Sequence, residues 1–334
     1  MKKYTLLLII YIIVVVIIGF KRIKTRIGSR KGRNSLVENS DFANQNKDLI
    51  ERIMRENIIP RNKHLLTVAL IIGLIGLVLF FSVYFIFKNI SILAPISALL
   101  MFIGLIIIII LNINYQRNFK KNVLDKIIKA YNSNYEYYPY DGIDVHEYEI
   151  CRFPEVCDIY TSEDLIVDTS STFRYADVLI KSESEDNEGN HTTSIEYSGS
   201  IARIDVIDCQ CEIFLGGMKR DSLFDKKYQK IKFENDKFND LFSAYASSEL
   251  NAYKILTPDV MEQFVHLKEN TYGDIDIRIL HNRLYIRFLS GDGFVPSLLN
   301  KKREMNSIIS SLAVLEEVVS VLNTVKNLIE KNMN

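Results

Sequence analysis

The chain's four cysteines are the residues whose chemistry is easiest to test against their spacing. A structural zinc site built from thiolates usually presents them as Cys-x₂₋₄-Cys pairs. Cys151 and Cys157 are too far apart for such a pair, and Cys209 and Cys211 would share one face of a strand. In a reducing compartment these side chains are better interpreted as buried thiols. A zinc-dependent sensor remains a minor alternative.

The acidic stretch SESEDNEGN, residues 182–190, invites comparison with a calcium-binding loop. If Gly189 is taken as the loop glycine, an EF-hand would place its first ligand at Ser184 and its twelfth at Ile195. Neither residue type suits those positions. We therefore predict an exposed hairpin tip here.

Other catalytic patterns are missing from the sequence. It contains no Gly-x-Ser-x-Gly, no phosphate-binding Gly-x-x-x-x-Gly-Lys and no His-Glu-x-x-His. The doublets Glu163–Asp164 and Glu316–Glu317 are interpreted as ordinary surface charges. The sequence thus predicts no catalytic, cofactor-binding or metal-binding residue. The histidines form no ligand motif: His64, His146, His191, His266 and His281.

Long apolar segments are the first elements that organise the chain. Thr5 to Phe20 contains no charge and is near the short limit for crossing about 30 Å of hydrocarbon. It ends in IIGFKRIK, without the small-x-small site of a cleaved signal peptide. We favour an uncleaved transmembrane anchor over residues 1–20, with a cleaved signal peptide as the alternative.

A second apolar region, residues 65–111, divides into two predicted spans, Leu65–Phe87 and Ile90–Leu111, which form a helical hairpin. Small residues lie in stripes along both helices, where they allow close packing. Packing within the hairpin is favoured over a seam between copies. Neither helix contains an ionisable residue, which argues against a transporter or channel.

Basic residues set the predicted orientation. Seven Lys and Arg residues lie within 21–33, and five more within 117–129. Because positive charge stays on the cytoplasmic side, the N-terminus is predicted outside and residues 21–64 and 112–334 are predicted in the cytoplasm. The localisation is thus the inner (plasma) membrane, multi-pass. The basic run also suits anionic lipid headgroups.

Residues 21–64 are interpreted as a basic cytoplasmic linker that contains an amphipathic helix. The apolar residues of NKDLIERIMRENIIP follow a helical stripe that ends at Pro60. We expect this helix to pack on the membrane surface or on the cytoplasmic domain.

The cytoplasmic region, 112–334, begins with a helix over 114–132 that places Phe119, Val123, Ile127 and Ala130 on one side. Alternating patterns then predict strands, followed by helices over 235–248 and 257–267 and a hairpin over 274–289 that turns at His281-Asn282. Strands are predicted over 143–153, 164–173, 175–182, 192–197, 201–214 and 228–234.

A long amphipathic helix is predicted at the C-terminus, over 303–332, as a cover for the sheet, with a coiled-coil dimer seam as the alternative. Thr257 and Pro258 mark the start of the helix predicted over 257–267. The fold class is α+β: transmembrane helices followed by a cytoplasmic domain with a mainly antiparallel sheet and packed helices. The stripe of the last helix is Ile308, Leu312, Leu315, Val319, Leu322 and Ile329, interrupted by Lys326.

Residues 233–264, FENDKFNDLFSAYASSELNAYKILTPDVMEQF, carry a combination of short patterns. Phe238 and Phe242 form a spaced pair, and Ile255–Pro258 with Met261 form the stretch ILTP-x-x-M. Upstream, YTSEDLIVDT and IFLGG (Ile213 to Gly217) add to it, and LYIRF (Leu284 to Phe288) follows downstream. Together these resemble the bacterial domain of unknown function 3137 family over residues 115–330.

The resemblance departs from the family pattern at two positions, since Glu249 stands where Asp is usual and Asp168 replaces a glycine. It implies a membrane hairpin with a cytoplasmic domain and no assigned activity. It supplies no catalytic residues, and the first span looks like an addition to the family pattern.

Charge is segregated although the formal net charge is zero. Residues 141–199 are rich in Asp and Glu and contain few Lys and Arg, whereas residues 218–232 are basic. Overall neutrality gives no reason to expect nucleic acid as a partner. We predict a membrane-anchored protein that displays a cytoplasmic protein-interaction or assembly domain. Its expected partners are the lipid bilayer and an unknown protein or a second copy. The alternative is an enzyme with an unrecognised active site near the inner membrane surface.

Overall fold

A computed structural model describes residues 45–57, 67–68, 71–72, 76, 93–185, 189, 191–207, 209, 211–217, 227–271, 273–289, 294 and 301–333. The predicted N-terminal anchor, the basic run 21–33 and most of the first hairpin helix lie outside these residues. The chain divides into two compact units. The larger is built mainly from Tyr131–Phe294 and Asn306–Asn334, and the smaller from Lys47–Ala130 and Val295–Met305.

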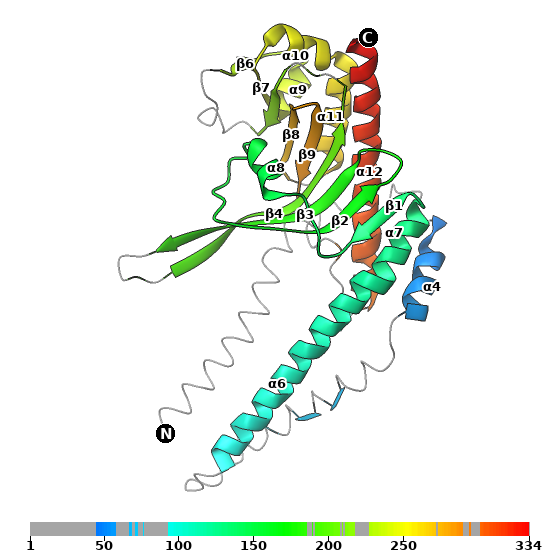
Figure 1. Ribbon diagram of the computed structural model, residues 1–334, viewed down its shortest axis with the longest axis vertical. Coiled ribbons are helices and arrows are strands. Elements are labelled where there is room, and N and C mark those ends of the chain that lie inside the picture. Colours follow the sequence, from blue (N-terminus) through cyan, green and yellow to red (C-terminus); the bar gives the residue numbers. More distant parts are fainter. Residues whose placement is uncertain are drawn as a thin grey trace. The chain divides into compact units, whose positions relative to one another are not determined.

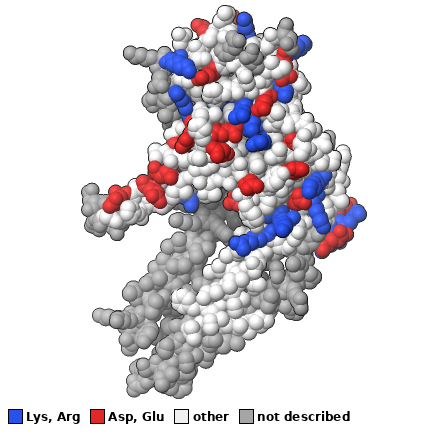
Figure 2. Space-filling view, viewed as in Figure 1, with Lys and Arg blue, Asp and Glu red and all other residues white. Residues whose placement is uncertain are grey.

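The smaller unit is built around one continuous helical rod. Helix α6 (Leu93–Asn118) leads into the π-helix η1 (Phe119–Leu124) and then into α7 (Asp125–Tyr131). The sequence of α6 carries no charge before Arg117 in its last turn. Figure 2 shows a stretch of this helix without charged side chains, and Lys and Arg gather at its C-terminal end. Large apolar side chains are exposed along α6: Leu99, Phe102, Ile103, Ile106, Ile109, Ile110 and Ile113.

Helix α4 (Lys47–Asn57) packs against η1 and buries Ile50 and Met54. The amphipathic helix predicted in the linker therefore exists, and its apolar side contacts the rod. The rod's own buried side differs from the prediction, because Leu124 and Ile128 are buried and Ala130 is exposed. The wider π-turn, with its i→i+5 bonding, shifts the phase of the stripe and explains the difference.

The larger unit contains one sheet of nine strands in the order β1-β2-β3-β4-β9-β8-β5-β7-β6 (Figure 1). Every neighbouring pair is antiparallel, which confirms the predicted α+β class with an antiparallel sheet. The strands are β1 Tyr135–Tyr138, β2 Ile159–Asp168, β3 Arg174–Glu185, β4 His191–Asp205, β5 Ile213–Gly216, β6 Gln229–Ile231, β7 Ser243–Ala246, β8 Ile275–Leu280 and β9 Arg283–Phe288.

Helices cover both faces of this sheet. The short helix α8 (Val145–Ile150) lies on one face, which we call the α8 face. Helices α11 (Pro258–Asn270) and α12 (Lys301–Met333) lie behind the other, the α12 face (Figure 1). A polar contact of 3.0 Å between His266 Nδ1 and Glu317 Oε1 joins these two helices. The remaining helices are α9 (Asp236–Leu241) and α10 (Glu249–Ile255).

Two of the described helical segments, Phe102–Tyr131 and Met305–Met333, are long and apolar enough to cross a membrane. The two segments differ in burial. Of the most apolar 18 residues of each, 67% are buried in Met305–Met333 and 25% in Phe102–Tyr131. A helix that is mostly buried within a folded unit behaves as a core helix. Met305–Met333 therefore has the role predicted for it, a long amphipathic cover of the sheet.

The buried stripe of α12 has a slightly different phase from the predicted one. Val318 and Val325 are fully buried, whereas Val319 is only half-buried. Lys326 lies beside the stripe and does not interrupt it, because Val325 occupies the core position. The stripe thus follows the 3.6-residue repeat through Leu315, Val318 and Leu322.

Because Val318 is buried and Val319 is only half-buried, substituting each in turn tests which face of α12 packs on the sheet. Val318→Ala should lower the free energy of unfolding by about 1.5–2.5 kcal/mol, because two buried methyl groups are lost and a cavity remains. Val319→Ala should cost less than about 0.5 kcal/mol. Pulse proteolysis of the full-length protein in a urea series measures both. Equal losses at the two positions would contradict the phase.

Two predicted elements are wrong. Residues 143–153 form helix α8 and a turn where a strand was predicted, because Asp144 caps the helix by accepting a 2.8 Å hydrogen bond from the His146 backbone N–H. The helix predicted over 235–248 ends at Leu241, and β7 follows it. Strand β7 pairs with β5 and β6 on its two sides, and this tertiary pairing overrides the local helical pattern.

Two local predictions need smaller corrections. The strands predicted over 192–197 and 201–214 are divided differently: β4 is continuous from His191 to Asp205, and a separate strand, β5, begins at Ile213. Thr257 occupies the N-cap position of α11 with an extended backbone, but its side chain makes no capping bond. Its hydroxyl instead lies 3.4 Å from the Asn332 side-chain amide near the end of α12.

Candidate functional site

The α8 face of the sheet carries buried charged side chains on three adjacent strands. In β8 the alternation places Asp276 and Arg278 on this face, while Ile277 and Ile279 point to the α12 face. The same alternation in β9 places Tyr285 and Arg287 on the α8 face. All of these side chains are buried. Charged groups in such a place require specific partners.

Arg287 has the densest set of partners. Its guanidinium makes a bidentate pair with Glu155, with Nη2 donating over 3.0 Å to Oε1, and it also donates to Asp276 and to the Tyr148 hydroxyl. The aromatic rings of Phe153 and Tyr197 lie 4.0 and 4.2 Å from the guanidinium carbon. Burial alone lowers the pKa of Arg287, but Asp276, Tyr197 and Glu155 outweigh it and hold the net pKa well above its ordinary value.

Arg278 binds backbone carbonyls. Its Nε donates to Cys151 O over 2.9 Å, and its Nη1 donates to Leu215 O over 2.7 Å and to Ile277 O over 2.9 Å. The guanidinium lies against the rings of Phe153 and Phe214. One side chain therefore ties the segment after α8 to strands β5 and β8.

Glu147, on α8, forms a second connection between the helix and the sheet. Its Oε1 lies 2.7 Å from Arg203 Nε on β4 and 3.4 Å from Arg283 Nη1 on β9. The Tyr285 hydroxyl donates to the same oxygen over 3.0 Å. Together with Arg278 and Arg287, these contacts fasten residues 143–158 across the middle of the sheet.

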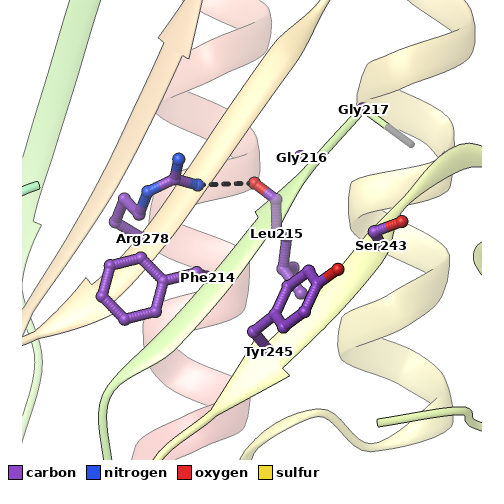
Figure 3. Close-up of a pocket in the computed structure, with 7 residues that line it drawn as sticks. All are labelled: Phe214, Leu215, Gly216, Gly217, Ser243, Tyr245 and Arg278. Carbon is purple, nitrogen blue, oxygen red and sulfur yellow. Dashed lines mark hydrogen bonds between the residues drawn. The ribbon is translucent and has the colours of Figure 1, made fainter. Parts of the chain in front are cut away.

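A small hollow opens beside this network, at the end of strands β5 and β7 (Figure 3). Arg278 lines one side of it, and the dashed hydrogen bond in Figure 3 joins Arg278 to the Leu215 carbonyl. The hollow's empty volume is about 200 Å³, part of which is open solvent. Pockets for small-molecule ligands usually measure about 300–1,000 Å³. The other lining residues are Phe214, Gly216, Gly217, Ser243 and Tyr245.

The titratable groups of the site are held protonated or paired. Burial raises the pKa of the Cys151 thiol to about 12, although Arg278 opposes it. Burial likewise raises the pKa of Tyr148 to about 12 and that of Tyr197 well above its ordinary value. The carboxylates of Glu147, Glu155 and Asp276 each lie against at least one arginine. The arrangement offers strong structural hydrogen bonds and neither a thiolate nucleophile nor an accessible general base.

Thiol reactivity checks this description. Cys151, Cys209 and Cys211 are buried as predicted, whereas Cys157 is exposed, which corrects the prediction of a buried thiol there. With a pKa of about 12, Cys151 would be about 10⁻⁴ thiolate at pH 8. Iodoacetamide should therefore label Cys157 in the folded protein and label Cys151 only after denaturation, as read by peptide mass spectrometry. Comparable labelling of the two in the native state would contradict a closed site.

The structure does not bring the histidines together. His146, His191 and His281 are exposed, His266 pairs with Glu317, and His64 lies outside the described residues. Within the described residues, no group of three or more His, Cys, Asp or Glu side chains is placed to hold a metal ion.

Asp164 corrects the prediction of an ordinary surface charge. It is buried, has a positive φ of 61° and accepts a hydrogen bond from the Tyr137 hydroxyl. It lies within the irregular register of β2 between Glu163 and Ile166. Its role is to fix the bulged strand against β1.

The charged network itself escaped the sequence reasoning. Asp276, Arg278 and Arg287 alternate with Ile and Phe in DIDIRILHNRLYIRF, which reads equally well as a half-exposed hairpin. The network could have been inferred only from the composition of residues 143–158, which supply acidic and aromatic partners for these arginines. Phe214 and Gly217 from IFLGG and Tyr245 from residues 233–264 line the same hollow.

Comparison with known proteins supports the resemblance over part of the chain. Residues 200–330 match the model of a family described as protein of unknown function (DUF3137). This stretch begins within β4, ends in the last turn of α12 and contains Arg203, Arg278 and Arg287. No curated protein and no solved structure matches the chain significantly.

Proposed function

We propose that the chain is a multi-pass protein of the plasma (inner) membrane whose larger unit is a cytoplasmic protein-interaction or assembly domain. The observation that carries this proposal is the closed α8 face. Its charged groups are engaged within the fold, and the described hollow beside them is smaller than a substrate pocket. What the domain offers to another molecule is therefore its outer surface.

Membrane attachment is supported by α6. Its exposed Ile, Leu and Phe side chains would be costly in water and are suited to lipid. Arg117, Lys120 and Lys121 follow within about two turns of Ile113. Apolar side chains followed directly by cations are the pattern of a helix that leaves the bilayer on its cytoplasmic side.

Two experiments test the two halves of the proposal. A green fluorescent protein fused to the C-terminus should fluoresce in cells, because that fusion matures in the cytoplasm; a dark fusion with an active periplasmic reporter would overturn the topology. In-cell cross-linking with mass spectrometry should then recover a stoichiometric protein partner or a second copy. A strictly monomeric particle without cross-linked neighbours would overturn the interaction role.

A further inference from the structure

The exposed side of the helical rod changes from apolar to basic along a single face. Arg117, in the last turn of α6, and Lys121, in η1, are both exposed. They continue the spacing of three or four residues that the exposed isoleucines of α6 follow, so they lie in line with that apolar stripe. Lys121 is the third residue of η1, too early in the wider turn for its phase to have shifted far. The exposed isoleucines are Ile106, Ile110 and Ile113, and the opposite side of the rod buries Leu111, Tyr115 and Phe119.

The side chains of Arg117 and Lys121 are not engaged within the fold. In the part of the chain that the structure describes, neither makes an ion pair or a side-chain hydrogen bond. Farther along the rod the situation differs, because Lys129 Nζ lies 3.3 Å from Asp125 Oδ1. Two unpaired cations on one exposed face can therefore bind an anion from outside the protein.

The positions of the two cations along the rod match the headgroup layer of a bilayer whose hydrocarbon ends near Ile113. At 1.5 Å per residue, Arg117 lies about 6 Å beyond Ile113 and Lys121 about 12 Å beyond it. The headgroup layer is about 5–8 Å thick on each side of the hydrocarbon. Side chains on a helix lean toward its N-terminus, which here is toward the apolar stripe, so both cations can reach this layer.

A phosphate group beside the helix would satisfy both side chains. Residues four apart on a helix have Cβ atoms about 5–6 Å apart, close enough to contact one phosphate. The planar guanidinium of Arg117 can bind two phosphate oxygens at once, and the ammonium of Lys121 adds a second positive charge. A zwitterionic headgroup carries its own cation, which opposes this attraction. An anionic headgroup brings a net negative charge and should bind more tightly.

We propose that Arg117 and Lys121 form a binding site for the headgroup of an anionic phospholipid, such as phosphatidylglycerol, at the end of α6. Electrostatic attraction falls off within about 8 Å at physiological salt. Lys126 and Lys129 lie about 20 and 24 Å beyond Ile113, so they contribute little to this site. The inference rests on the proposed function, because the site exists only if α6 lies in the bilayer.

The sequence offers a direct way to identify the neighbouring lipid. The chain contains no tryptophan, so Ile113→Trp introduces a single fluorescent reporter beside the site. The full-length variant is placed in vesicles with equal amounts of phosphatidylcholine and phosphatidylglycerol, in which one lipid or the other carries bromine on its acyl chains. Bromine quenches tryptophan on contact, so the two quenching values show which lipid lies beside position 113. We expect phosphatidylglycerol to lie there about three- to ten-fold more often than phosphatidylcholine, and a preference below about 1.5-fold would overturn the proposal.

Charge-matched variants in the Ile113→Trp background test whether the preference is local. Replacing both Arg117 and Lys121 with Gln should reduce the preference to below about 1.5-fold. Replacing both Lys126 and Lys129 with Gln removes the same charge farther along the rod and should leave the preference unchanged. A preference that survives the first pair of substitutions, or falls equally with both pairs, would overturn the local site.

Vesicles of brominated phosphatidylcholine alone distinguish failure of this inference from failure of the proposed function. Strong quenching in these vesicles, equal in all variants, shows that position 113 faces lipid and that the substitutions leave α6 in place. Strong quenching there without a preference for phosphatidylglycerol in the mixed vesicles would refute this inference alone. Absence of quenching by either brominated lipid would refute the membrane placement of α6 and with it the proposed function.

Discussion

Replacing Arg287 with Met should lower the free energy of unfolding by about 3–5 kcal/mol, the cost of breaking a buried ion pair from one side. Arg287 is 1% exposed and satisfies Glu155, Asp276 and the Tyr148 hydroxyl at once. Met fills much of the volume between Phe153 and Tyr197, but Glu155 loses its cation and Asp276 keeps only the 3.7 Å contact with Arg278 Nη2. Pulse proteolysis of the full-length protein across a urea series measures the loss.

The control for this variant is Lys237→Met, which breaks an exposed pair with Glu269 and should change stability by less than about 0.5 kcal/mol. Adding Asp276→Asn and Glu155→Gln to Arg287→Met should recover part of the loss, since the uncompensated charges are then removed. A loss below about 1 kcal/mol in Arg287→Met would show that the network does not hold residues 143–158 on the sheet.

Gly199→Ala is expected to have the next largest effect, a loss of about 3 kcal/mol at the upper end of overpacking costs. A Cβ on Gly199 would lie 2.4 Å from the Phe288 carbonyl oxygen and 2.4 Å from the Tyr197 hydroxyl oxygen. The Tyr197 hydroxyl donates to that same carbonyl over 2.8 Å. Backbone on β9 would have to move, because the crowded atom is not at the end of a flexible side chain.

Gly217→Ala is its matched control, since the nearest atom to a Cβ there is Asp274 Oδ1 at 3.7 Å, an ordinary contact. We expect a change of less than about 0.5 kcal/mol. Thermal unfolding of the two variants under one set of conditions gives the comparison. Similar midpoints for Gly199→Ala and Gly217→Ala would refute the close approach of β4 to β9.

Local signals account for the elements that the sequence predicted well. The turn at His281-Asn282 joins β8 and β9 with two positive φ angles, 51° and 60°, as a two-residue hairpin turn requires. The long C-terminal helix and the helix over 257–267 rest on the 3.6-residue repeat and on Pro258 at the first helical position. These features depend only on neighbours along the chain.

The errors lie where distant residues decide the outcome. Phe242 to Ala246 follow a helical pattern, but β7 is buried between β5 and β6 and takes its conformation from them. Residues 143–153 alternate like a strand, yet α8 forms because the sheet beneath offers Arg203, Arg278 and Arg287 to Glu147, to the Cys151 carbonyl and to Tyr148. The pattern of neighbouring residues in the sequence carries no information about these distant partners.

By itself the sequence determined the periodicity of the strands and helices, the α+β class and the resemblance that the family match supports for residues 200–330. Only the tertiary structure decided that Asp276, Arg278 and Arg287 are buried and paired. Alternating charged and apolar residues are the pattern of any sheet with one face in water, so burial of the charged face depends on whether another segment covers it. Residues 143–158 provide that cover, more than a hundred residues away along the chain.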